Sequence, residues 1–210
     1  KVDVSYYAKP IYNWRQMGEI RYGLGDNLDV SVYAKIEFDW QQMDEIRLGL
    51  KANVDVSIYT DPDIYLEEMK QVRLGLQDNL DVFVYFKNNY SLKQMEQIRL
   101  GLKANVDISY FNDRTLMPSQ MEEIRKGLEN NVDISLYAKK EFFDVQMKEI
   151  RLGLEDNLDV SIYAKRDFNF LQMWEIRLGL KNNLDVSIYA KPEFTQYQMG
   201  LIRIGIEKGL

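Results

Sequence analysis

The sequence of 210 residues contains no cysteine and no histidine. Without cysteine there is no disulfide, no thiolate zinc site and no cysteine nucleophile, although this leaves the redox compartment open. Without histidine the chain lacks the best proton-transfer group near neutral pH and the commonest transition-metal ligand. Acidic pairs such as Asp44 with Glu45 are plentiful, and no single carboxylate stands out as a general acid or base. We therefore expect no enzyme, no catalytic residue, no metal and no cofactor.

Long apolar stretches are also lacking. Arginine or glutamate interrupts each one, so we expect no membrane span. The formal net charge is -6 and the isoelectric point is near 4.9, so a long phosphate backbone is repelled on average. At 46% hydrophobic and 29% charged residues, the composition is that of a folded chain. The expected partner is a protein or peptide, and no nucleic acid is expected.

The sequence does contain a strict repeat. An arginine follows four positions after each of eight methionines that lie 26 residues apart: Met17, Met43, Met69, Met95, Met121, Met147, Met173 and Met199. A fixed period of 20 to 50 residues is typical of a stacked repeat array. We predict one tandem-repeat solenoid domain over residues 1–210, built from eight repeats. Because the chain starts with Lys1 and both ends cut the repeat at the same phase, we expect a fragment of a longer protein.

Each repeat carries signals for the start of a helix. In the second repeat, Asp39 and Gln42 match a capping box, and Phe38 can pack on Met43 as a hydrophobic staple. Apolar positions then recur every three or four residues, which predicts an amphipathic helix. The same capping pair recurs as Ser91 with Gln94, Asn169 with Gln172 and Thr195 with Gln198.

The end of this helix is marked by one recurring residue. Seven repeats have asparagine there and the eighth has glycine: Asn27, Asn53, Asn79, Asn105, Asn131, Asn157, Asn183 and Gly209. Asparagine and glycine share tolerance of a left-handed backbone, which the residue after a helix often needs. The pattern predicts a helix of about 13 residues, or ~19 Å.

The segment from Asp29 to Ala34 fits two structures. As a strand, Leu28, Val30 and Val32 would alternate inward, giving a leucine-rich-repeat-like α/β solenoid. As a short helix, Asp29 would be the N-cap and Val30, Tyr33 and Ala34 would share a face. The position of Tyr33 is tyrosine in seven repeats and Phe111 in the other, which suits a packed helical face. We favour an all-α solenoid in which a long α-helix alternates with a short α or 3₁₀ helix.

A glycine recurs near the end of each long helix, where it costs about 1 kcal/mol relative to alanine. Its recurrence indicates a close backbone approach. On a helical wheel Leu48 lies to one side and Gly49 to the other, so a leucine of one repeat is expected to seat against the glycine of the next. By the same argument Gly101→Leu is expected to destabilise the array.

The repeat resembles a known sequence family. The segment Gln146-Met147-Lys148-Glu149-Ile150-Arg151-Leu152-Gly153-Leu154 is a representative copy, followed by a Leu-Asp-Val-Ser-x-Tyr-Ala segment. Over the whole chain this resembles an uncharacterised tandem-repeat family of gut Firmicutes proteins and their mobile elements. The architecture is also similar to leucine-rich-repeat variant solenoids that alternate α and 3₁₀ helices. The resemblance specifies the repeat and implies no activity.

Two charged positions recur in the repeats. The arginines are Arg21, Arg47, Arg73, Arg99, Arg125, Arg151, Arg177 and Arg203, and the aspartates are Asp29, Asp55, Asp81, Asp107, Asp133, Asp159 and Asp185. The arginines fit either an anion-binding column or a structural ladder in which each pairs with a recurring aspartate or with turn carbonyls. We favour the ladder, because residues identical in every repeat usually serve the stacking.

The segment that follows the first long helix partly matches a calcium-binding loop. Asn27, Asp29 and Ser31 match the first three oxygen positions of such a loop. Val32, however, stands where the turn glycine is needed, and Phe38 stands where the bidentate glutamate is needed. Helix capping already explains Asn27 and Asp29, so no calcium site is expected.

Function in a repeat protein is more often carried by positions that vary between repeats. Two groups of such positions are apolar or aromatic and are our predicted partner-binding residues. The first group is Phe83, Phe86, Tyr90 and Tyr110, and the second is Val145, Leu171, Trp174 and Tyr197. The stripe of Leu171, Trp174 and Leu178 indicates a partner surface, with Trp174 as anchor. Packing between adjacent repeats explains these residues equally well.

The leading hypothesis is a non-enzymatic scaffold that binds a protein or peptide. Base-by-base reading of nucleic acid would need a regular code, and the series Arg15, Gln41, Glu67, Lys93, Ser119, Val145, Leu171 and Tyr197 shows none. Mimicry of nucleic acid by an acidic surface would need the acidic residues in one strip, and lysine and arginine are interspersed. A passive spacer in a larger protein is the third possibility.

Overall fold

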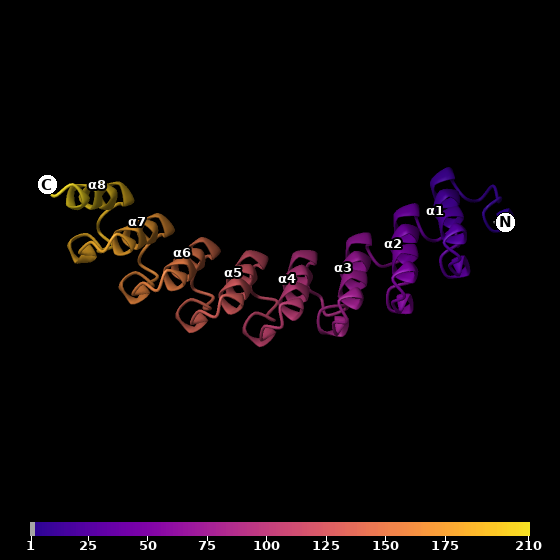
Figure 1. The fold of residues 1–210 in the computed structure, drawn as a ribbon, viewed down its shortest axis with the longest axis horizontal. Helices are drawn as coiled ribbons and strands as arrows, with labels where there is room; N and C mark the ends of the chain where they lie inside the picture. Colours follow the sequence, from indigo (N-terminus) through magenta and orange to yellow (C-terminus); the bar gives the residue numbers. More distant parts are fainter. Residues whose placement is uncertain (1–2) are drawn as a thin grey trace. The chain divides into compact units, whose positions relative to one another are not determined.

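The computed structural model describes residues 3–210, which form helices and connecting turns without a strand (Figure 1). The 3₁₀ helices are η1 (Val4–Tyr6), η2 (Val30–Val32), η3 (Val56–Ile58), η4 (Val82–Val84), η5 (Ile108–Tyr110), η6 (Ile134–Leu136), η7 (Val160–Ile162) and η8 (Val186–Ile188). The long helices are α1 (Trp14–Gly25), α2 (Trp40–Lys51), α3 (Leu66–Gln77), α4 (Leu92–Lys103), α5 (Pro118–Glu129), α6 (Asp144–Glu155), α7 (Phe170–Lys181) and α8 (Gln196–Glu207). The all-α prediction is confirmed, and the alternative with a strand per repeat is wrong.

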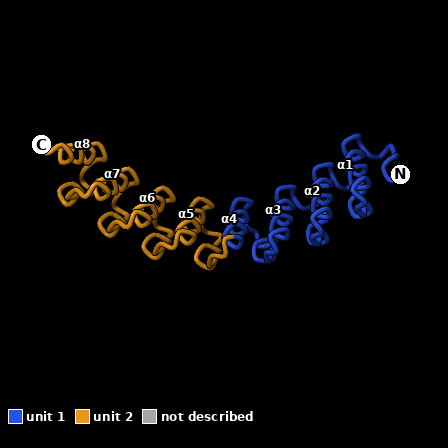
Figure 2. Tube along the Cα trace, in the orientation of Figure 1, with its two compact units in different colours: residues 1–103 blue, residues 104–210 orange. Residues whose placement is uncertain are grey.

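The chain divides into two compact units, residues 1–103 and residues 104–210 (Figure 2). In unit 1 the helices α1 to α4 pack in sequence order, each on the next. In unit 2 the helices α5 to α8 pack in the same way. Each unit is therefore an α-solenoid in which the main contacts between long helices join neighbouring repeats.

The long helices begin where the capping pattern predicts. Asp39 Oδ1 accepts hydrogen bonds from the backbone N–H groups of Gln41 and Gln42, both at 2.8 Å, and Asp39 N donates to Gln42 Oε1 at 3.1 Å. The same reciprocal box forms at Ser91, Asn169 and Thr195. Helix α3 lacks this box: its N-cap residue, Tyr65, makes no side-chain cap, and Glu68 stands where the other long helices have glutamine. Each long helix has 12 residues, one fewer than expected.

The capping glutamine also ties one repeat to the next. The amide of Gln42 donates to the carbonyl oxygens of Pro62 and Ile64, each at 3.0 Å. Gln146 donates in the same way to the carbonyl of Phe168 at 2.7 Å. The glutamine side chain thus accepts from a backbone N–H group at the start of its own helix and donates to carbonyl oxygens in the loop of the following repeat. These hydrogen bonds explain why a polar side chain is buried there.

The helices end at the recurring asparagine, as predicted. Its φ angle is between 55° and 57° in all seven repeats, and Gly209 has a φ angle of 68°. In the first repeat Leu28 N donates to Gly23 O at 2.9 Å, which is the long-range bond of a Schellman turn. Two residues after the asparagine, Asp29 Oδ1 accepts from Ser31 N at 3.0 Å and caps η2. The chain therefore passes from α-helix to 3₁₀ helix through a single left-handed residue.

The close approach at the recurring glycine comes from a tyrosine, not from a leucine. Tyr33 is fully buried, and its hydroxyl donates to the carbonyl of Glu19 at 3.1 Å. A Cβ atom added to Gly23 would lie 1.9 Å from the Tyr33 hydroxyl and 2.9 Å from Val30 Cγ1. The expected seating of a leucine against the next repeat's glycine is therefore wrong. The same arrangement joins Gly49 with Tyr59, Gly75 with Tyr85, Gly127 with Tyr137, Gly153 with Tyr163 and Gly179 with Tyr189.

This geometry predicts the effect of adding one methyl group. In Gly153→Ala the new Cβ would lie 1.9 Å from the Tyr163 hydroxyl and 2.8 Å from Val160 Cγ1. Overpacking of this kind costs about 1–3 kcal/mol, which outweighs the gain of about 1 kcal/mol in helix propensity. We expect the variant to melt at a lower temperature by circular dichroism. The matched control is Gly205→Ala, because no atom lies within 4 Å of its added Cβ, and it should melt higher. Equal stabilisation of both variants would contradict the account.

The buried tyrosines also predict how stability depends on pH. Burial raises the pKa of Tyr137 and Tyr163 well above the ordinary value of 10.0, although Arg151 and Arg177 respectively oppose the rise, and it raises the pKa of Tyr189 to about 12. Above pH 10 the unfolded chain loses these protons while the folded chain keeps them. Stability is therefore fully present below about pH 10 and falls as pH rises through the folded pKa values, by up to about 1.4 kcal/mol per pH unit for each tyrosine.

Urea unfolding at a series of pH values between about 9 and 11.5 measures this fall. The variant Tyr163→Phe loses the hydrogen bond to the Glu149 carbonyl, 3.2 Å long, and is expected to be less stable at pH 9. Its stability should nevertheless fall less steeply with pH, because one ionisable group has been removed. An unchanged slope in the variant would show that Tyr163 does not contribute.

Candidate interaction surface

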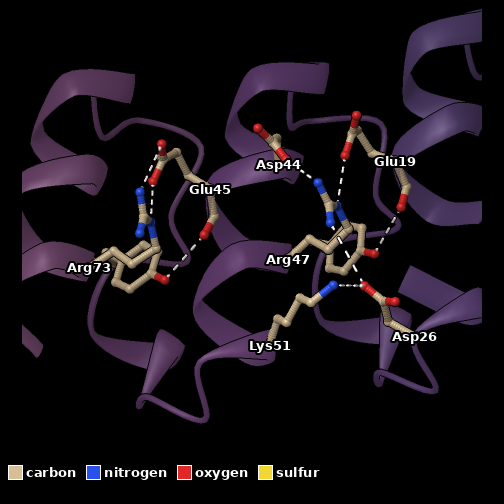
Figure 3. Close-up of polar contacts among 9 residues, drawn as sticks. Glu19, Asp26, Asp44, Glu45, Arg47, Lys51 and Arg73 are labelled. Atoms are coloured by element: carbon tan, nitrogen blue, oxygen red, sulfur yellow. Dashed lines mark hydrogen bonds and ion pairs between the residues drawn. The ribbon is translucent and has the colours of Figure 1, made fainter. Parts of the chain in front are cut away.

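The recurring arginines link neighbouring long helices through glutamate. Arg47 Nε donates to Glu19 Oε2 at 2.8 Å, and Arg73 Nε donates to Glu45 Oε2 at 2.6 Å (Figure 3). In each case the glutamate belongs to the preceding helix, 28 residues earlier. In unit 2 the equivalent pairs are Arg151 with Glu123, Arg177 with Glu149 and Arg203 with Glu175, all at 2.8 Å. Arg125 forms an ion pair with Glu129 of its own helix at 2.5 Å.

The partner in this ladder differs from the expected one. The recurring aspartates, including Asp55, Asp81, Asp107, Asp133, Asp159 and Asp185, accept hydrogen bonds from the residue two positions later and cap the 3₁₀ helices. The predicted pairing of arginine with these aspartates is therefore wrong. Each aspartate lies at the start of the short helix, where the free N–H groups hold its carboxylate.

One arginine shows what the ladder tolerates. Arg99 Nε donates to Gln71 Oε1 at 2.8 Å, and its nearest carboxylate oxygen, from Asp78, is 3.9 Å away. A neutral amide thus occupies the place of the glutamate without loss of the hydrogen bond. Glutamine is a conservative replacement at this position of the repeat.

A second ladder, which was not predicted from the sequence, joins the ends of the long helices. Lys51 pairs with Asp26 at 2.8 Å, and Lys181 pairs with Asp156 at 2.9 Å. Where the earlier residue is asparagine, the later one is glutamate: Asn130 donates to Glu155 at 2.6 Å and Asn182 donates to Glu207 at 2.7 Å. The signal was present as residue pairs separated by 25 positions that change together. Such exposed pairs contribute little to the stability of the fold, but the residue in each repeat is complementary to its partner in the neighbouring repeat.

Unit 2 has an apolar groove of about 510 Å³ between α7 and α8. Its walls are Leu171 and Trp174 on α7, and Tyr197, Leu201 and Ile204 on α8. These side chains are 39%, 40%, 76%, 73% and 40% exposed, respectively, so the groove presents apolar surface to solvent. An exposed apolar patch of this kind is typical of a binding surface.

A glycine opens this groove. Gly200 follows the repeat methionine, where other repeats have charged residues such as Asp44, Lys70 and Glu96. A Cβ atom added there would lie 2.9 Å from Glu175 Oε1, so the space above this carboxylate exists because position 200 has no side chain. Glu175 lines the groove and is 8% exposed.

The structure brings together part of the predicted partner-binding set. Leu171, Trp174 and Tyr197 line the groove, whereas Val145, on α6, is 39% exposed and is not part of its lining. Both Leu171 and Trp174 remain accessible, although packing between repeats was the alternative explanation for them. This cluster is the strongest candidate site in unit 2.

The predicted aromatic group in the middle of the chain is divided between the two units. Phe83 in unit 1 and Tyr110 in unit 2 are 64% and 56% exposed, and Tyr90 is half-buried. The prediction that Phe86 binds a partner is wrong, because Phe86 is 4% exposed and belongs to the core. Phe86 packs in the core at a position where five repeats have alanine and two others have Thr60 and Asn112.

Unit 1 contains a hollow that sequence reasoning missed. It measures about 580 Å³ and is lined by residues of α1 and α2 and by Tyr7. The guanidinium of Arg15 lies over the rings of Trp14 and Trp40, at 5.2 and 5.0 Å from their centroids. The signal that could have found it is Gly18, which occupies the same repeat position as Gly200. A glycine after the repeat methionine thus accompanies a hollow in both cases.

Comparisons of the chain with protein families, curated proteins and solved structures find no match. Within residues 3–210, none of the helices combines the length and apolar character needed to cross a bilayer. The same residues contain no group of three or more acidic side chains placed to hold a metal ion.

Proposed function

We propose that this protein is a non-enzymatic repeat scaffold that binds a protein or peptide through the groove between α7 and α8. The observation that carries the proposal is the exposure of Leu171, Trp174 and Tyr197 at positions where most repeats have polar or charged residues. The residues that every repeat shares are engaged in capping, in the tyrosine–glycine contact or in the arginine ladder. The positions that differ are the ones left to contact a partner.

The energetics of the groove support a binding role. Complete burial of one large apolar side chain by a partner contributes about 1.5–3 kcal/mol to the free energy of binding. Five such side chains lie around one concave surface, so a complementary partner can offset the entropy lost on association. Trp174 is the expected energetic centre, because tryptophan in a pocket is the residue most often found to dominate an interface.

Selection from a peptide library displayed on phage tests this proposal. We expect selection on the immobilised chain to enrich peptides whose binding weakens by about tenfold or more in Trp174→Ala. The matched control is Trp14→Ala, which removes a tryptophan that is 77% exposed but lies in unit 1, and it should leave binding unchanged. Failure to enrich any peptide, or enriched peptides that bind Trp174→Ala as well as the wild type, would favour a passive spacer over a scaffold.

A further inference from the structure

The floor of the α7–α8 groove has a different chemistry from its walls. The side chain of Glu175 accepts one hydrogen bond, from Arg203 Nε to Oε2 at 2.8 Å. Its other oxygen, Oε1, is the atom nearest to the empty Cβ position of Gly200 and receives no hydrogen bond from residues 3–210. A carboxylate oxygen with no donor, on a side chain that is 11% exposed, therefore lies at an apolar groove.

An acceptor in this environment selects for a donor in the ligand. A carboxylate oxygen that has no donor and lies beside apolar surface forms its strongest hydrogen bond with a charged donor. None of the residues that line the groove is a lysine or arginine, and Arg203, which lies outside this lining, binds only the other carboxylate oxygen, Oε2. The net charge of -6 adds a general attraction for cationic partners.

The aromatic walls favour the same class of ligand. Lysine and arginine have apolar stems that lie against apolar surface while the charged head stays polar, and their heads are attracted to the faces of tryptophan and tyrosine. The hollow in unit 1 shows this arrangement within the chain, because Arg15 lies over two tryptophan rings beside Gly18. In the eighth repeat, Tyr197 occupies the place of Arg15, so rings are present and the cation is missing.

We propose that the α7–α8 groove binds a lysine or arginine flanked by apolar residues in a partner protein. The cationic head lies at Glu175 Oε1, its stem lies between Trp174 and Tyr197, and the flanking apolar residues cover Leu171, Leu201 and Ile204. This inference rests on the proposed function and names the chemistry of the partner. It excludes acidic segments, which the Glu175 carboxylate repels.

Three dye-labelled peptides of 12 residues provide the probe. They share leucines three positions before and four positions after a central residue, on an uncharged background with blocked ends, and differ only in having arginine, glutamine or glutamate at the centre. Fluorescence anisotropy measures their affinity for the full chain. We expect the arginine peptide to bind with a Kd below about 100 µM, the glutamine peptide to bind about tenfold more weakly, and the glutamate peptide not to bind.

Two variants test the role of Glu175 itself. Glu175→Gln should weaken binding of the arginine peptide to the level of the glutamine peptide and leave the glutamine peptide unaffected. The fold should tolerate it, because Gln71 already holds Arg99 in the same way, and equal melting temperatures check this. Gly200→Lys should abolish binding, since it fills the gap with a cation of the kind found at Lys70 and Lys148.

The matched control is Glu149→Gln, which changes the equivalent residue of the preceding repeat, where Glu149 pairs with Arg177 at 2.8 Å and does not line the groove. It should leave all three affinities unchanged. If Glu149→Gln weakens binding as much as Glu175→Gln does, the effect acts through the array and the inference is wrong.

Two further outcomes separate this inference from the proposed function. Equal binding of the arginine and glutamine peptides that still depends on Trp174 would overturn the role of Glu175 while leaving the scaffold intact. Absence of binding by all three peptides would overturn the proposed ligand chemistry, and the library selection would then decide the scaffold independently.

Discussion

The contact of a tyrosine hydroxyl with the backbone of the preceding long helix recurs at six tyrosines and sets the local geometry of the repeat there; at the equivalent position Phe111 is buried without a hydroxyl. The tyrosine contact requires a helix without a side chain at one position, and glycine supplies this at Gly23, Gly49, Gly75, Gly127, Gly153 and Gly179. The hydroxyl reaches the helix only because the left-handed asparagine and the aspartate cap turn the chain back within a few residues. The end of the helix, the 3₁₀ turn and the buried tyrosine therefore act together. The close packing that they produce fixes the position of the next helix.

The charged ladder depends on that placement. Arg47 reaches Glu19 because the two helices are held at a constant offset, and the same offset recurs in Arg177 with Glu149. Breaking such a half-buried pair leaves a charge without its partner, whereas the glutamine at position 71 keeps the hydrogen bond. Once these shared residues have built the stack, a change at one variable position alters only the local surface. Gly200, beside Trp174, is such a change, and it turns the seam between two helices into a groove.

Much of the local structure was predictable from the sequence, because it depends on residues close together in the chain. The capping boxes, the left-handed asparagines and the aspartate caps were all predicted and are confirmed. The partners of the six arginines that bridge neighbouring helices were not predicted, because each lies 28 residues away and its identity depends on how far neighbouring helices are shifted along each other. Phe86 was assigned to the surface, although the 3₁₀ geometry turns its position inward. The groove was predicted only in part. Leu171, Trp174 and Tyr197 were predicted to bind a partner because they are apolar where most repeats are polar. The role of Gly200 becomes visible only in the structure, where Glu175 lies beneath it.

The central claim is that binding occurs where the repeats differ, at α7 and α8. The chain contains three tryptophans, one in the groove and two in the hollow of unit 1, so their indole N–H signals report on both places at once. The most direct measurement is a nitrogen–proton NMR titration with a bound peptide, with the signals assigned from single Trp→Phe variants. The account predicts that the Trp174 signal shifts in a saturable way while those of Trp14 and Trp40 stay in place. A shift of Trp14 and Trp40 without Trp174 would contradict it.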